Sequence, residues 1–246
     1  MSIKKSLLFF FTVCICVINP DGYRGQTVTT TLTYKVNKPN VITKKTPVLI
    51  MLHGYGSNET DLFDIAKTVD ERYIVFSLRA PYVLKDGGFC WYDLQFLPQQ
   101  QFTHNYNEAK ESRKKILSFI SNACKSFGVD SSQIFLMGYS QGSIMAYDVA
   151  FASPSKIKGV IALSGLLLEE TKALKTDWTK AINVKFFIAH GNSDNVIKIA
   201  EAEKVTAFLK TKKVIDVTYK TYEMPHAIMG NELNDIKKWL KKVITN

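Results

Sequence analysis

Short continuous apolar runs alternate along the chain with longer segments of helical periodicity. Apolar runs of about four to eight residues between turn signals are typical of strands buried on both faces. Strands are predicted at residues 27–36 (an edge strand with alternating β-branched residues), 47–52, 73–78, 134–137, 157–163, 184–189 and 215–222. Helices are predicted at residues 59–70, 108–127, 141–152 and 197–209, and around Ile236, Trp239, Leu240, Val243 and Ile244, which recur at intervals of three and four.

The alternation of short strands with helices indicates the fold class. It favours right-handed crossovers and a mostly parallel, twisted sheet covered by helices on both faces, in a single α/β domain. Residues 81–104 show no periodicity, and a loop of that length in a compact domain commonly carries function. Ligands of such sheets bind beyond the carboxyl ends of the strands, so the residues that follow each strand are the candidates for chemistry.

The first 25 residues follow a different pattern. Lys4 and Lys5 precede an apolar run over residues 7–18, and the turn-rich residues 19–22 end it. This order predicts a secretory signal peptide at 1–25, a domain at 26–246, and an exported protein, periplasmic or secreted. The apolar run is shorter than the roughly 20 residues that a transmembrane helix needs.

Composition and charge narrow the classes of partner. With 46% hydrophobic and 22% charged residues, the chain is neither disordered nor fibrous. Its net charge of +10 falls to +8 without the first 25 residues. The lysines at 237, 238, 241 and 242 are expected on the solvated face of the last helix, with no nucleic-acid motif beside them. Nucleic acid is therefore not expected as a partner, whereas a weak association with anionic membrane surfaces stays open.

Two cysteines remain once residues 1–25 are set aside. Cys90 and Cys124 are too few for a disulfide scaffold in a chain of this length. They are expected to be small, partly buried residues, although pairing in an oxidising compartment stays an alternative.

A candidate nucleophile follows the strand at 134–137. Residues 138–142, Gly-Tyr-Ser-Gln-Gly, match G-x-S-x-G between an apolar strand and a predicted helix. In that context the pattern is typical of a nucleophile elbow, in which glycines permit a sharp turn that exposes the serine at a helix N-terminus. Ser140 is thus the candidate nucleophile, and a purely structural glycine-rich turn is the plainer alternative.

A serine hydroxyl needs a base, and the base needs an orienting acid. In this architecture the chain order is serine, acid, histidine. His226 follows the strand that ends near residue 222, whereas His53 and His104 precede the serine and His190 precedes the acid, so His226 is the candidate base. Asp194 is the carboxylate in the loop after the strand at 184–189. A turn histidine at 226 and a helix cap or Asx-turn at 194 are the structural alternatives.

The developing oxyanion needs two backbone N–H donors. Gln141, directly after the serine, is expected to give one, and Tyr55, in the glycine-rich loop after the strand at 47–52, the other, with Gly54 as its rival. His53 is expected to brace this loop, because no partners at metal-ligand spacing accompany it. No metal or cofactor is expected.

Seven blocks carry a family resemblance, and they occur in family order over about residues 32–244. Together they resemble the phospholipase/carboxylesterase family of α/β-hydrolases, which includes acyl-protein thioesterases and bacterial carboxylesterases. The blocks are LHGYGSNETDL (52–62), SLRAPY (77–82), CWYDL (90–94), GYSQGS (138–143), ALSG (162–165), HGNSDNVI (190–197) and MPHAI (224–228).

The resemblance implies hydrolysis of an ester by a serine. It implies a single α/β-hydrolase domain with Ser140, Asp194 and His226 as the triad and Tyr55 and Gln141 as oxyanion donors. It also implies that Trp91 lies in a loop that shapes the substrate pocket. The length of about 220 residues from 26 to 246 leaves little room for a large lid. Departures from the family pattern, which bear on pocket shape rather than on the reacting groups, are Ser143, Ile197 and Pro225.

Substrate identity is the least defined expectation. Leu166 and the two leucines after it follow a strand and are candidates to line an acyl site, although a leucine run is commonly core. Small-molecule esters and lipid esters are equally compatible with these residues as substrates. A serine peptidase on the same fold and a non-catalytic module that binds an apolar ligand are the alternative functions.

Overall fold

A computed structural model describes residues 26–96 and 102–245; the predicted signal peptide lies outside them. The centre of the molecule is a seven-stranded sheet with strand order β1-β3-β2-β8-β9-β10-β11. Only β1 runs antiparallel to its neighbour within this sheet. The strands are β1 (Tyr34–Asn37), β2 (Val48–Leu52), β3 (Ile74–Leu78), β8 (Ile134–Tyr139), β9 (Gly159–Leu163), β10 (Lys185–Gly191) and β11 (Val217–Tyr222).

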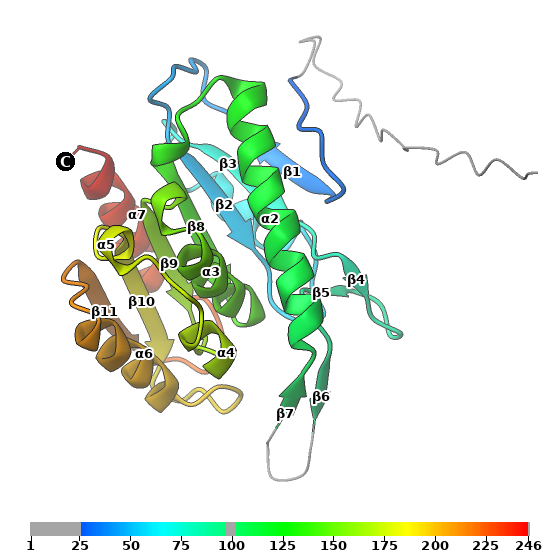
Figure 1. Cartoon of the computed structure of the whole chain (residues 1–246), viewed down its shortest axis with the longest axis vertical. Coiled ribbons are helices and arrows are strands. Elements are labelled where there is room, and N and C mark those ends of the chain that lie inside the picture. The colour runs from blue at the N-terminus through cyan, green and yellow to red at the C-terminus, as the bar shows by residue number, and fades with distance from the viewer. Residues whose placement is uncertain (1–25, 97–101, 246) are drawn as a thin grey trace, which may run out of the picture.

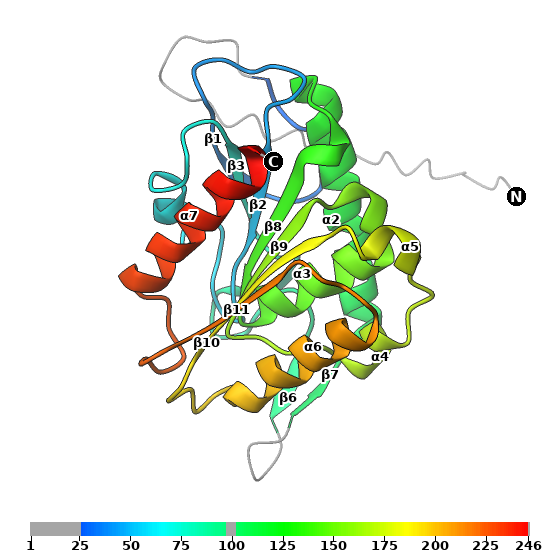
Figure 2. The ribbon, with the colours of Figure 1, turned by 90° about the vertical axis from the view of Figure 1, so that its left-hand side faces the viewer.

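Helices cover both faces of the sheet, which explains why its central strands are apolar at every position. In β2 all five residues are buried: Val48, Ile50 and Leu52 pack into one core, and Leu49 and Met51 into the core on the opposite face. Figure 1 shows α2 (Tyr106–Phe127), α3 (Gln141–Ala152) and α6 (Ile199–Thr211) in front of the sheet. The quarter turn of Figure 2 places α7 (Gly230–Thr245) on the other face, and α1 (Phe63–Ala66) packs into that same core. This confirms the predicted fold class, one α/β domain with a mostly parallel sheet covered by helices on both faces.

Two predicted elements are shorter than the sequence pattern suggests. The predicted helix 59–70 contains only the four-residue α1, because the residues before it form turns between residues three apart: Asp61 N donates to Asn58 O (3.3 Å) and Phe63 N donates to Thr60 O (3.1 Å). The predicted strand 27–36 is paired only from Tyr34 onward. Before it, Val28 and Leu32 are buried without ladder pairing, so their alternation reflects packing alone.

The aperiodic segment 81–104 contains two small hairpins. They are formed by β4 (Tyr82–Val83) with β5 (Phe89–Cys90), and by β6 (Leu94–Phe96) with β7 (Phe102–His104). The short helices α4 (Glu169–Lys172) and α5 (Trp178–Ala181), which were not predicted, follow β9. They are one turn each, too short to leave a periodic signal.

The lysine-rich last helix is amphipathic as expected. Ile236, Trp239, Leu240 and Val243 of α7 are buried in the core, and Lys238 is exposed on the outer side. Cys90 and Cys124 are both buried and both free, in accordance with the reading as small core residues. Within residues 26–96 and 102–245, no helix is long and apolar enough to cross a membrane.

Candidate active site

Ser140 lies in a strained turn between β8 and α3. Its φ of 52° and ψ of −119° fall where side-chain-bearing residues are rarely found, and such strain persists only when the surroundings enforce it. A Cβ on Gly142 would lie 1.9 Å from the carbonyl oxygen of Leu52, so the first turn of α3 can approach β2 only with glycine there. The geometry is that of a nucleophile elbow, and it leaves the Ser140 side chain partly exposed.

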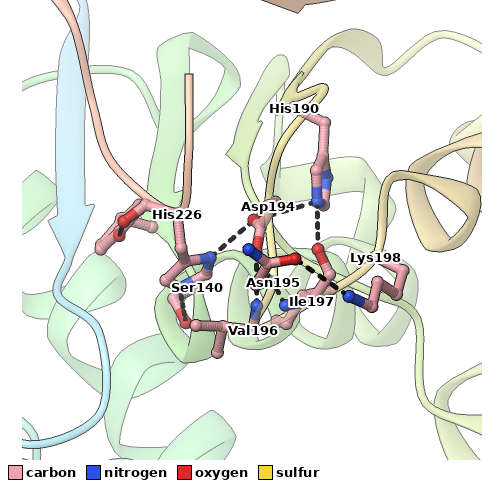
Figure 3. Close-up of polar contacts among 9 residues, drawn as sticks. Ser140, His190, Asp194, Asn195, Val196, Ile197, Lys198 and His226 are labelled. Atoms are coloured by element: carbon pink, nitrogen blue, oxygen red, sulfur yellow. Dashed lines mark hydrogen bonds and ion pairs between the residues drawn. The ribbon is translucent and has the colours of Figure 1, made fainter. Parts of the chain in front are cut away.

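The three predicted side chains of the triad are brought together from the ends of three strands. His226 Nε2 lies 2.9 Å from Ser140 Oγ, and His226 Nδ1 lies 2.7 Å from Asp194 Oδ2. Figure 3 shows this chain of contacts, with the imidazole between the hydroxyl and the carboxylate. Asp194 can only accept when ionised, so Nδ1 carries the proton and Nε2 is left to accept the proton of Ser140.

The Asp194 carboxylate is desolvated and held by the backbone. The residue is 4% exposed, and its Oδ1 accepts bonds from Val196 N (2.8 Å) and Ile197 N (2.9 Å). Asp194 therefore forms an Asx-type turn and also orients the histidine, so the two readings of this residue coexist.

Main-chain hydrogen bonds join the loop that carries Asp194 (the acid loop, residues 192–198) to the loop that carries His226 (the histidine loop, residues 223–229). Asn192 N donates to Tyr222 O (2.8 Å), and Ser193 N donates to Met224 O (3.2 Å). The hydroxyl of Tyr139 donates to the carbonyl oxygen of His226 (3.0 Å), and the two rings pack with centroids 5.1 Å apart. Burial, followed by the nearby Asp194 charge, raises the pKa of Tyr139 to about 12, so this donor keeps its proton at neutral pH.

The glycine-rich loop after β2 borders the serine, as an oxyanion loop must. A Cβ built on Gly54 would lie 3.5 Å from Ser140 Cβ. Ser57 N donates to Gly54 O (3.3 Å) and Gly56 N donates to Phe89 O (2.9 Å), which fixes the backbone around Tyr55. Gln141 is the first residue of α3, so its N–H lies at the positive end of that helix. The two expected donors thus come from segments on either side of Ser140.

His53 braces this loop. Its Nε2 accepts a bond from Ala80 N (3.0 Å), so Nδ1 carries the proton and donates to Gly54 O (2.7 Å). Burial lowers the pKa of His53, with the Gly54 carbonyl opposing the shift, so the ring is neutral when it makes these bonds. Across the described part of the chain, no group of three His, Cys, Asp or Glu side chains is placed to hold a metal ion.

The side chain of Gln141 has a second role that the sequence did not reveal. It is buried, and its Oε1 accepts from Trp91 N (2.9 Å) while its Nε2 donates to Tyr92 O (2.7 Å). The indole N–H of Trp91 in turn donates to His53 O (2.9 Å). Gln141 and Trp91 therefore tie the elbow, the segment after β5 and the loop after β2 together.

The two candidate substrate-binding residues differ in exposure. Trp91 has no exposed surface, so the structure places it beneath the site, where it shapes the loops but offers no face to a substrate. Leu166 is partly exposed, whereas Leu167 and Leu168 are buried in the core. Of the leucine run, Leu166 alone presents appreciable surface.

His190 is a residue whose place the sequence reasoning missed. Its place before the acid in the chain argues against a role as the base, yet its Nε2 lies 2.8 Å from Ile197 O and 3.2 Å from Asp194 Oδ2. Its position at the carboxyl end of β10, four residues before Asp194, was the available signal.

The parallel sheet, the elbow after β8 and the Ser140–His226–Asp194 contacts place this chain in the α/β-hydrolase class. A family model described as phospholipase/carboxylesterase matches residues 36–244, and the chain belongs to this family. It is accordingly a hydrolase of the carboxylic-ester type, as the resemblance predicted.

Individual relatives agree with that membership. "Acyl-protein thioesterase 1" of Mycosarcoma maydis is 28% identical over 232 residues, which cover 85% of this chain and 96% of that protein. "Lysophospholipase-like protein 1" of Mus musculus is 25% identical over 205 residues, covering 78% and 84%. The crystal structure of the Bacillus cereus carboxylesterase has a TM-score of 0.75 at 24% identity, with 87% and 96% of the chains covered, and supports the fold.

Proposed function

We propose that this protein is an exported serine esterase that hydrolyses carboxylic esters and thioesters through Ser140, His226 and Asp194, by way of an acyl-enzyme. The observation that carries the proposal is the unbroken set of contacts from Ser140 Oγ through His226 to Asp194, at 2.9 and 2.7 Å. Both distances are within the range in which a general base takes the proton of a nucleophile.

In the first half-reaction, Ser140 Oγ attacks the carbonyl carbon while its proton passes to His226 Nε2. Asp194 stabilises the imidazolium that forms, and the backbone N–H groups of Tyr55 and Gln141 stabilise the oxyanion. The bond to the leaving oxygen or sulfur then breaks, and His226 Nε2 returns the proton to it. The products are a free alcohol or thiol and an acyl group on Ser140.

In the second half-reaction, water replaces the alcohol. His226 Nε2 takes a proton from water as its oxygen attacks the acyl carbon, and returns the proton to Ser140 Oγ as the acid leaves. Each step uses only these side chains, the two backbone N–H donors and water. Leu166, partly exposed and packed against the core, is the residue that we place beside the acyl chain.

Export is the part of the proposal that rests on the first 25 residues alone. A basic start, an apolar run at 7–18 and a turn-rich exit support removal of a signal peptide. N-terminal sequencing of the protein recovered outside the cytoplasm tests this, and recovery of intact residues 1–25 on cytoplasmic protein contradicts it.

The basic surface supports a weak association with anionic membranes. The exposed Lys238, Lys241 and Lys242 project from the outer side of α7. Cosedimentation with phosphatidylglycerol vesicles should fall steeply between low and high salt. Binding that is absent at low salt contradicts the association and leaves the hydrolytic site unaffected.

The central test replaces the nucleophile. Ser140→Ala should lower hydrolysis of a short-chain nitrophenyl ester by about 10³-fold or more while the protein stays folded. The matched control is Ser121→Ala, because Ser121 is exposed on α2 and contacts Leu117 and Lys156, remote from the triad. Wild-type turnover by the Ser140→Ala variant contradicts the proposal.

Two further measurements separate the alternative functions. A fluorophosphonate should label Ser140 in an esterase, whereas a non-catalytic binding module should show no adduct. Turnover of peptide amides in preference to esters would instead indicate a peptidase with the same triad.

A further inference from the structure

The acid loop leaves the sheet immediately before it supplies Asp194. His190 is the penultimate residue of β10 and pairs in register with Thr221 of β11, so its backbone belongs to the rigid sheet. Asp194 lies outside any strand or helix, in the loop that ends where α6 begins at Ile199. Its carboxylate therefore depends on side-chain and turn contacts for its position.

The residue that closes this loop is Ile197. Its N–H donates to Asp194 Oδ1 (2.9 Å), and its carbonyl oxygen faces His190 Nε2 (2.8 Å). Because Ile197 holds Asp194 with one backbone group and His190 with the other, a displacement of Ile197 moves the carboxylate. The same Nε2 lies 3.2 Å from Asp194 Oδ2, the oxygen that faces His226 (Figure 3).

The imidazole of His190 contributes more than packing. It is fully buried, and its Nδ1 has no hydrogen-bond partner among the residues that the structure describes. Burying a polar atom without a partner costs free energy, which an apolar side chain of similar shape would avoid. What the imidazole adds is one donor, Nε2–H, because the carbonyl that it faces can only accept.

We propose that His190 is a positioning residue of the hydrolytic site: through Nε2–H it holds the carbonyl of Ile197 and the edge of Asp194, and thereby fixes the carboxylate against His226. The proposal rests on the proposed function for its effect on rate. The structural part of the proposal is that His190 carries its proton on Nε2 and holds the acid loop through it. That part does not depend on the proposed function.

Amide substitutions separate the donor from the rest of the ring. Glutamine extends its N–H₂ to about the place of histidine Nε2, whereas asparagine reaches only the place of Nδ1, which faces no partner. His190→Asn should therefore lower kcat for a nitrophenyl ester by about 10- to 100-fold, as a misplaced catalytic group does, with little change in KM. His190→Gln should recover kcat to within about threefold of wild type. Equal kcat values for the two folded variants, or loss through KM alone, would overturn the proposal.

The wild-type protein gives a test that needs no variant. The chain has four histidines, so nitrogen-15 spectra of histidine-labelled protein can be assigned and the protonated ring nitrogen identified. A proton on Nε2 of His190 supports the proposal, and a proton on Nδ1 overturns it even if every substitution unfolds the protein. The result does not depend on Ser140, so failure of this inference and failure of the esterase function are distinguishable.

Discussion

Glu232 carries a buried carboxyl group in the first turn of α7, the helix that follows the His226 loop. Its side chain has no exposed surface, and neither carboxylate oxygen has a hydrogen-bond partner within the described ranges. Burial raises its pKa from 4.5 to about 7, and the nearby amide of Met229 opposes this only in part. We predict that replacing this residue with Gln makes the fold less sensitive to pH.

The magnitude follows from the difference between the two states. Because the pKa of Glu232 is higher in the folded chain, the folded protein binds more protons than the unfolded one between about pH 4.5 and pH 7. Stability therefore falls as the pH rises through this window and levels off above it. The full difference, from 4.5 to about 7, corresponds to about 3 kcal/mol, or about 6–12 °C in melting temperature for a domain of this size.

Thermal unfolding at about pH 5 and about pH 8 tests this. Glutamine carries no charge at either pH, so the gain in melting temperature of Glu232→Gln over wild type should be several degrees larger at pH 8 than at pH 5. A buried amide has its own cost, but that cost does not vary with pH. The control is Glu71→Gln, at an exposed position. It should change the melting temperature by the same amount at both pH values. A difference in melting temperature between Glu232→Gln and wild type that is the same at both pH values would show that the Glu232 carboxyl does not titrate differently in the folded chain.

Two further predictions concern the elbow. Gln141→Leu leaves the buried backbone N–H of Trp91 and the carbonyl oxygen of Tyr92 without the hydrogen bonds that the Gln141 amide now makes. The free energy of unfolding in urea should therefore fall by about 2–4 kcal/mol. An unchanged urea midpoint contradicts this. Gly142→Ala places a Cβ 1.9 Å from a carbonyl oxygen and should abolish fluorophosphonate labelling of Ser140. Gly230→Ala, where a Cβ meets nothing within 4 Å, should leave labelling intact, and equal labelling of both variants contradicts this account.

The main helices and strands could be predicted because their apolar runs and apolar periodicity are signals contained in the local sequence. The helix predicted at residues 141–152 has the same bounds in the structure, since the elbow glycines mark its start and Pro154 marks its end. The helix predicted at 59–70 was too long, because the turns on both sides of α1 bury apolar residues at the same spacing as a helix does. Periodicity does not distinguish the bonds between residues three apart, such as Phe63 N to Thr60 O, from the bonds between residues four apart that make an α-helix.

The site residues that were missed act through contacts rather than through motifs. The side chain of Gln141 bonds to segments about 50 residues away in sequence, and no spacing rule contains that pairing. Outside the site, Glu232 looks like an ordinary acidic residue of a helix first turn, and only the packing of α7 onto the sheet buries it. The approach of Ser140, His226 and Asp194 to one another was predictable because each lies shortly after the end of a strand, where the topology gathers side chains.

In the function that we propose, Ser140 carries the acyl group during turnover. Acid quenching of the protein during rapid hydrolysis of a nitrophenyl ester, followed by peptide mass mapping, tests this most directly. We predict that the acyl mass appears on the peptide that contains Ser140, and that it is lost from the Ser140→Ala variant but not from Ser121→Ala. An acyl group on another residue, or turnover that leaves no acyl group on Ser140 under conditions where the alcohol is released in a burst, would contradict the account.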